Sequence, residues 1–187
     1  MLRSLTIALA ATALFTVRLC AQQPAAPAPA APIADSADVA TLDGVMHALY
    51  DVISGDSGQA RNWDRLRSLM APGARLIPTF RRRDGSGYAI RPLTVEEYIL
   101  AATPAIARTG FHEREVARRS ETYGQIVHLF STYESRRRAD DAQPFERGIN
   151  SFQLYNDGHR WWVVTIMWQP ESQGPAIPAR NLVTENH

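Results

Sequence analysis

The sequence contains no lysine and a single cysteine, and both scarcities remove whole classes of chemistry. All 20 basic residues are arginine, so no lysine can form a Schiff base or act as a general base. Cys20 lies in a stretch that we expect to be removed on export, which leaves the mature chain without a thiolate nucleophile, a disulfide or a cysteine-based metal site. HExxH, GxSxG and phosphate-binding glycine motifs are also missing, so zinc-protease, serine-hydrolase and nucleotide-binding functions have no support.

Residues 1–21 have the pattern of a signal peptide. Arg3 supplies the positive start, residues 5–17 form the apolar stretch, and small residues precede the expected cleavage point after Ala21. The apolar stretch is shorter than an ordinary membrane span requires. We therefore expect an exported protein, periplasmic or secreted. Lipidation of Cys20 is the alternative, although the residues just before it are poor neighbours for that processing.

Charge and composition divide the rest of the chain. Removing Arg3 and Arg18 with the leader changes the balance from 20 basic against 19 acidic residues to 18 against 19, a net charge of −1. A near-neutral protein gives no electrostatic reason to expect nucleic acid or an anionic membrane as a partner. Residues 22–37 are rich in Ala and Pro and predict an exposed linker, residues 38–170 a single domain, and residues 171–187 a C-terminal tail.

Two helices are predicted at the start of the domain. Apolar residues recur at three- and four-residue spacing from Val39 to Ile53, which predicts an amphipathic helix over residues 38–54. Asn62 is the expected N-cap of a second, shorter helix that ends at Pro72-Gly73. The apolar stripe of the first helix should lie on a sheet.

A short hairpin and a third helix follow. Residues 74–80 and 88–92 predict two strands that join around Asp84-Gly85. Thr94 to Glu97 form a capping box, which predicts that a helix starts directly after Thr94. We expect Pro104 to end or kink this helix.

Residues 111–169 predict four consecutive antiparallel strands. In the second pair, Asp157-Gly158 predicts a two-residue turn, which sets Phe152 opposite Val163, with Asn150 on the same face. We expect this face to line a pocket. The opposite face would carry Ser151, Gln153, Trp162 and Trp168, and we expect it to meet a partner.

The first pair of these strands holds the sharpest candidate for chemistry. A tight turn near Ser120-Glu121 would set Glu113 opposite His128, on the face that carries fewer charges and should therefore point inward. A carboxylate beside an imidazole can orient it, raise its basicity and let it move a proton on a ligand. The alternative is a buried polar pair whose two members only satisfy each other.

The predicted order of elements is typical of the α+β class. We expect three N-terminal helices to pack on the concave face of a curved antiparallel sheet. Together with the runs at residues 127–134 and 156–164, this order resembles the nuclear transport factor 2-like superfamily, the cone-shaped fold of SnoaL-type cyclases, ketosteroid isomerases and scytalone dehydratases. The resemblance covers residues 38–169. It implies a conical pocket for a small apolar ligand and a homodimer through the exposed sheet face. It implies no particular activity, because the same cone hosts enzymes, binders and structural subunits.

The function that we expect is binding of a small, largely apolar molecule by an exported protein, with no cofactor and no metal. One alternative is a cofactor-independent isomerase, cyclase or dehydratase that uses His128 with Glu113. Another is a structural or partner-binding dimeric domain. Besides this catalytic pair, the candidate ligand-binding residues are Tyr50, Tyr98, Arg75, Phe130, Asn150 and Phe152.

Overall fold

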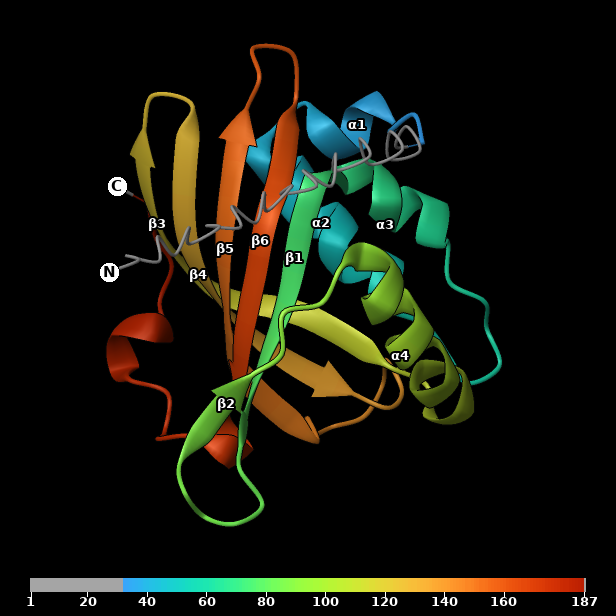
Figure 1. Ribbon diagram of the computed structural model, residues 1–187, viewed down its shortest axis with the longest axis vertical. Helices are drawn as coiled ribbons and strands as arrows, with labels where there is room; N and C mark the ends of the chain where they lie inside the picture. Colours follow the sequence, from blue (N-terminus) through green and yellow to red (C-terminus); the bar gives the residue numbers. More distant parts are fainter. Residues whose placement is uncertain (1–31, 187) are drawn as a thin grey trace, which may run out of the picture.

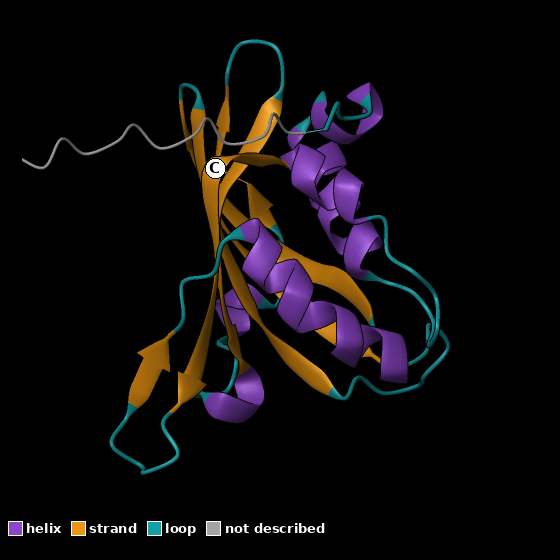
Figure 2. Ribbon diagram, turned by 45° about the vertical axis from the view of Figure 1, so that its right-hand side comes forward, coloured by secondary structure: helices purple, strands orange, loops and turns teal. Residues whose placement is uncertain are grey.

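The computed structural model describes residues 32–186, which are organised around one curved sheet with the strand order β2-β1-β6-β5-β4-β3-β7 (Figure 1). The helices α1 to α4 lie on one side of this sheet (Figure 2). The expected α+β class is therefore confirmed. The strands are β1 (Met70–Arg81), β2 (Tyr88–Ile90), β3 (His112–Tyr123), β4 (Ile126–Arg136), β5 (Glu146–Asn156), β6 (Trp161–Pro170) and β7 (Glu185–Asn186). The predicted signal peptide, Cys20 and most of the linker lie outside the described residues.

The first predicted helix is two helices, α1 (Ser36–Val39) and α2 (Leu42–Ile53). Thr41 separates them because its backbone is extended and its side chain accepts a hydrogen bond from the backbone N–H of Gly44 at 3.0 Å, which makes it an N-cap. The apolar stripe of α2 packs on the sheet as predicted, with Val45, Met46 and Leu49 buried in the core.

The other two helices begin where their caps predict. Asn62 caps α3 (Trp63–Leu69) by accepting from the backbone N–H of Arg65, and the capping box starts α4 (Val95–Thr109). α3 ends before Pro72-Gly73 because β1 already begins at Met70. α4 does not end at Pro104. The proline ring removes one backbone N–H donor from the interior of the helix. Leu100, one turn earlier, is well exposed.

The predicted hairpin is present, with β1 and β2 antiparallel and Phe80 opposite Ala89. β1 joins the main sheet by parallel pairing with β6, while the four long strands β3 to β6 are antiparallel. At the other edge β7 pairs in parallel with β3, and the hydroxyl of Thr132 donates to the backbone carbonyl of Asn181. The C-terminal tail therefore covers part of the outer face over β3 and β4.

The predicted register of the first long hairpin is wrong. The turn lies at Gly124-Gln125, where Gly124 adopts a φ of 56°, and not at Ser120-Glu121. His128 consequently lies opposite Glu121, and a bulge at Val116 then sets Glu113 opposite Ser135, on the other face from His128. Both strands are longer than expected, so the glycine was the better indicator of the turn.

The second long hairpin also differs from its prediction. The carboxylate of Asp157 accepts from the backbone N–H groups of His159 and Arg160, which stabilises a four-residue loop in place of a two-residue turn. Val164 is then an extra residue in β6, because Leu154 pairs with Val163 and Gln153 pairs with Thr165. This bulge reverses the facing of the rest of β6 and turns Ile166 and Trp168 inward, opposite Phe152 and Asn150.

Candidate functional site

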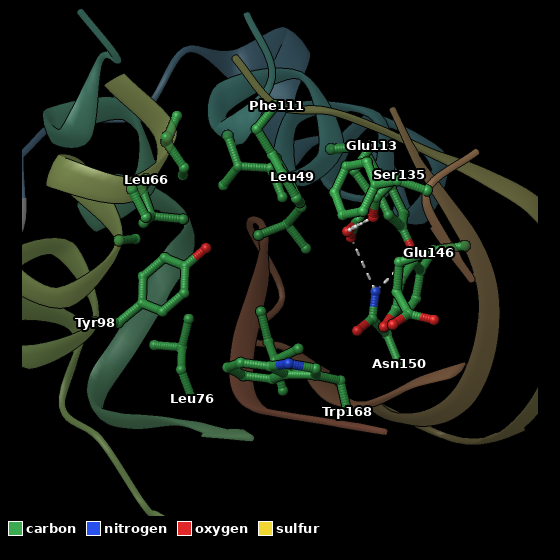
Figure 3. Close-up of a pocket in the computed structure, with 18 of the residues that line it drawn as sticks. Leu49, Leu66, Leu76, Tyr98, Phe111, Glu113, Ser135, Glu146, Asn150 and Trp168 are labelled. Atoms are coloured by element: carbon green, nitrogen blue, oxygen red, sulfur yellow. Dashed lines mark hydrogen bonds between the residues drawn. The ribbon is translucent and has the colours of Figure 1, made fainter. Parts of the chain in front are cut away.

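A cavity of about 350 Å³ lies between the inner face of the sheet and helices α2 and α4 (Figure 3). Its wall is mainly apolar and aromatic. α2 contributes Leu49 and Ile53, α4 contributes Ala102 and Ile106, and β6 contributes Trp168. Volumes of this order are typical of small-molecule sites, and so is a wall with few polar groups. The cavity is therefore the leading candidate for a binding site in residues 32–186.

Glu113 is the polar centre of this cavity. Its position follows from a junction between α2 and β3, in which Gly55 and Phe111 exchange two backbone hydrogen bonds and Ser54 bonds the backbone of Glu113. One carboxylate oxygen accepts from the hydroxyl of Ser135 at 2.8 Å, and the other accepts from the amide nitrogen of Asn150 at 3.4 Å. The carboxylate is thus held by two neutral donors and no ion pair within the described chain.

Burial raises the pKa of Glu113 to about 7, although the hydrogen bonds from Ser135 and Asn150 act in the opposite direction. The cause is desolvation, because the surrounding apolar wall stabilises a charged carboxylate far less than water does. Near neutral pH the side chain therefore has comparable populations of acid and carboxylate. A group in this condition can both accept and donate a proton.

A chain of hydrogen bonds behind the cavity fixes Tyr50 and Asn150. The amide nitrogen of Asn150 donates to the Tyr50 hydroxyl at 3.1 Å, and that hydroxyl lies 2.6 Å from Ser131 Oγ. Ser131 donates to Glu115 at 2.5 Å, which in turn pairs with Arg118. Burial and the nearby Glu113 charge raise the pKa of Tyr50, although its hydrogen bonds with Ser131 and Asn150 act in the opposite direction, so it stays neutral.

Several polar atoms at the cavity have no hydrogen-bond partner among residues 32–186. They include the hydroxyls of Tyr98 and Tyr133, the amide oxygen of Asn150 and the indole N–H of Trp168. Figure 3 shows the Tyr98 hydroxyl directed into the cavity from the side opposite Asn150. Burial and the Glu113 charge raise the pKa of both phenols, so both remain hydrogen-bond donors. These atoms are available to a ligand.

Tyr133 reaches the cavity because a glycine lies beneath it. Gly148 is directly opposite Tyr133 in the β4–β5 pair, and a Cβ at that position would lie 2.4 Å from the phenol oxygen and 2.5 Å from the backbone oxygen of Gln169. Only a residue without a side chain permits this approach.

A second, polar hollow of about 640 Å³ lies between α2 and β3 and shares Tyr50 and Glu113 with the cavity. Its charges are largely paired, since Arg118 bridges Glu115 and Asp43. His47 and His112 also line it. Glu113 therefore stands between an apolar cavity and an ion-paired surface hollow.

The structure brings five of the eight predicted site residues to the cavity and leaves three outside. The five that line it are Tyr50, Tyr98, Glu113, Asn150 and Phe152. Arg75 is exposed and donates to the backbone oxygens of Gly73 and Ala74, because its neighbours Ala74 and Leu76 take the inward positions of β1.

His128 and Phe130 lie on the outer face of the sheet, so the predicted Glu113–His128 pair is wrong. His128 is exposed, its Nε2 lies 3.2 Å from Ser151 Oγ, and its ring contacts Phe130 edge to face at 5.2 Å. The inward positions of β4 are taken by the odd-numbered residues from Val127 to Ser135.

Sequence reasoning missed several residues of the wall, among them Trp168, Tyr133, Ser135, Phe145 and Glu146. A two-residue turn at Asp157-Gly158 predicts Trp168 on the outer face, and the bulge at Val164 turns it to the inner face. The isolated Gly148 inside a strand pattern was a usable signal, because such a glycine often marks a close approach.

Within residues 32–186 no three His, Cys, Asp or Glu side chains come together as a metal site would require. In the same part of the chain, no helix combines the length and the apolar character needed to cross a bilayer.

No protein-family model matches the chain, and no curated protein does. Solved structures do. A protein of unknown function with a cystatin-like fold from Nostoc punctiforme aligns with a TM-score of 0.50 at 11% identity, over 71% of this chain and 92% of that one. A protein from Kribbella flavida aligns with a TM-score of 0.50 at 12% identity, over 73% and 93%.

A nuclear transport factor 2-like protein of unknown function from Silicibacter pomeroyi aligns with a TM-score of 0.47 at 14% identity, over 70% of this chain and 93% of that one. At such identities the likeness concerns the fold alone. The chain thus has a curved-sheet α+β fold like that of the cystatin-like protein from Nostoc punctiforme, in agreement with the order of its elements.

Proposed function

We propose that the cavity binds a small, largely apolar molecule, whose polar group is held at the Glu113 end. The observation that carries this proposal is the combination of an apolar wall with a few convergent polar atoms that have no partner in the described chain. The apolar body would gain from leaving water, and the polar atoms would orient it. A filled core would have paired these atoms within the protein.

A cavity-filling variant tests this proposal. Ala102 on α4 lines the cavity, whereas its neighbour Ala101 is exposed, so Ala102→Trp fills the space and Ala101→Trp is the matched control. A neutral fluorescent probe, N-phenyl-1-naphthylamine, should bind the natural chain and the control, and lose at least about tenfold in affinity in Ala102→Trp. Equal binding by both variants would place the probe elsewhere and contradict the proposal. Native mass spectrometry of the purified protein would show any retained ligand.

Proton transfer in the same cavity is the second candidate function, and the pKa of Glu113 near 7 favours it. Glu113 would be the base, and the Tyr98 hydroxyl would donate a hydrogen bond to the developing negative charge; His128 would have no part. Ring opening of 5-nitrobenzisoxazole begins with removal of a carbon-bound proton, so it reports on a base in an apolar site. The rate of ring opening should rise as the pH increases through about 7 and be lost in Glu113→Gln. An unchanged rate in that variant would contradict this candidate function.

Export belongs to the proposal and rests on residues 1–21 alone. Expression of the full chain should yield a mature protein that begins at Gln22, and intact mass spectrometry of the exported fraction measures this directly. A mass that corresponds to an acylated Cys20 would favour the lipoprotein alternative.

A further inference from the structure

We propose that the ligand of this cavity is an organic cation, an apolar body that carries an ammonium group. This inference rests on the proposed binding function and adds the class of ligand. It follows from the charges of the cavity, from its aromatic wall and from the kind of polar atom that is left open.

The charges come first. Two carboxylates, Glu113 and Glu146, line the cavity, and neither is part of an ion pair within residues 32–186. Glu146 accepts only from the backbone N–H of Arg147 and from Ser172. The cationic side chain at the wall, Arg137, is exposed at the rim, so water screens its charge. The interior therefore has an excess of negative charge that a cation would neutralise.

The wall is aromatic, which suits a cation as well as an apolar body. Tyr98 and Trp168 meet edge to face, with centroids 6.2 Å apart and planes at 85°, and Phe111 meets Phe145 at 6.2 Å. The faces of such rings attract cations, most strongly where water is excluded. The rim already shows this contact, because the Arg137 guanidinium lies 3.8 Å from the centroid of the Phe145 ring. Tyr50, Tyr133 and Phe152 complete the aromatic lining.

The open polar atoms include acceptors for an ammonium group, and the open phenol hydroxyls can also accept. Besides the carboxylate of Glu113, the amide oxygen of Asn150 is an acceptor without a protein donor, and ammonium groups supply donors. An anionic ligand would face two carboxylates with no buried cation to hold it. A neutral ligand would leave the buried charge of Glu113 uncompensated above neutral pH.

A permanent cation makes the inference measurable through pH. Binding would favour the charged form of Glu113, so the affinity should rise as the pH increases through about 7. The titratable and charged groups that line the two hollows with Glu113 are three phenols, five carboxylates, four guanidinium groups and two histidines: Tyr50, Tyr98, Tyr133, Asp43, Asp51, Glu115, Asp141, Glu146, Arg114, Arg118, Arg136, Arg137, His47 and His112. The phenols stay neutral in this range. A variant must separate the contribution of Glu113 from that of the other groups around it.

The test uses two probes of one shape, phenyltrimethylammonium and tert-butylbenzene, which differ in charge. Titration calorimetry at pH 8 should show at least about tenfold tighter binding of the cation. If tert-butylbenzene binds equally well or better, the cation inference is overturned while the proposed apolar pocket stands. If neither probe binds, the pocket proposal fails and the inference fails with it.

Glu113→Gln completes the design, and Glu121→Gln on the exposed part of the same strand is the control. The first should lower cation affinity at pH 8 about tenfold and abolish its rise with pH, and it should not weaken tert-butylbenzene binding, because the buried charge is gone. The control should change neither probe. A rise with pH that persists in Glu113→Gln would assign the rise to another group and overturn the role given to Glu113.

Discussion

The two faces of β4 carry similar residue types with opposite consequences. Ser131, Tyr133 and Ser135 point inward, and each is held by a precise contact or directed at the cavity. His128 and Phe130 point outward and contact mainly each other and Ser151. A histidine is the residue type usually associated with proton transfer, yet here it lies in water and a glutamate has acquired the perturbed pKa. Environment, more than residue type, creates a reactive group.

The largest expected effect tests how closely the inner face is packed. Gly148→Ala would place a Cβ against the phenol oxygen of Tyr133 and the backbone of Gln169, and we expect a loss of about 2–3 kcal/mol in the free energy of unfolding, measured by urea denaturation. Gly174→Ala is the control, because its Cβ would meet only the flexible end of the Gln169 side chain. Equal losses of unfolding free energy in the two variants would show that the inner face is not tightly packed at Gly148.

The next prediction concerns the buried charge. Because the pKa of Glu113 is raised to about 7, the folded state holds this proton more tightly than the unfolded state does. Its stabilising contribution is complete below the unfolded pKa of about 4.5 and is lost as the pH rises through about 7, at most about 3 kcal/mol in total. Glu113→Gln should therefore gain stability relative to the natural chain between pH 5 and pH 8.

His128→Gln sharpens the same comparison from the outer face. It should change the free energy of unfolding by less than about 0.5 kcal/mol at either pH, since the side chain is exposed. If His128→Gln altered the pH dependence as much as Glu113→Gln does, the contrast between the two faces would not hold.

A smaller effect is expected at Ser135, whose hydroxyl donates to the Glu113 carboxylate at 2.8 Å and so favours its charged form. Ser135→Ala should raise the pKa of Glu113 further, by about one unit. Carbon-detected NMR titration of the Glu113 carboxyl measures this directly. Ser151→Ala on the outer face is the control and should leave that titration where it was.

Substitutions on the outer face of the sheet should have the smallest effect on the cavity. We propose that two copies of the chain pair through this face. Phe130 on β4 is 41% exposed there, and Ile126 on β4 and Val164 on β6 are also exposed. Phe130→Glu should shift the protein to a monomer in analytical ultracentrifugation without changing ligand affinity. Leu100→Glu, at an exposed apolar position on the helix side, is the control. A natural chain that is already monomeric would refute the pairing.

Much of the fold could be predicted because its signals are local. Asn62, Thr94 and Glu97 make the capping contacts that their positions in the sequence indicate, and the hairpin of β1 and β2 forms where turn residues separate two apolar runs. The site was predicted in part. Glu113, Asn150 and Phe152 reach the cavity as expected, whereas His128, Phe130 and Arg75 do not.

The errors share one physical origin. Facing in a strand alternates with every residue, so a single turn or bulge that is displaced by one position reverses all the side chains beyond it. The displaced turn at Gly124 separated His128 from Glu113 along the strand, and the bulge at Val116 put them on opposite faces of the sheet, as the bulge at Val164 moved Trp168 to the inner face. Helix caps and turn residues act over three or four neighbours and can be recognised in a sequence. The meeting of Glu113 with Asn150, Ser135 and the phenols depends on pairing between distant strands, and so does the pKa that desolvation there produces.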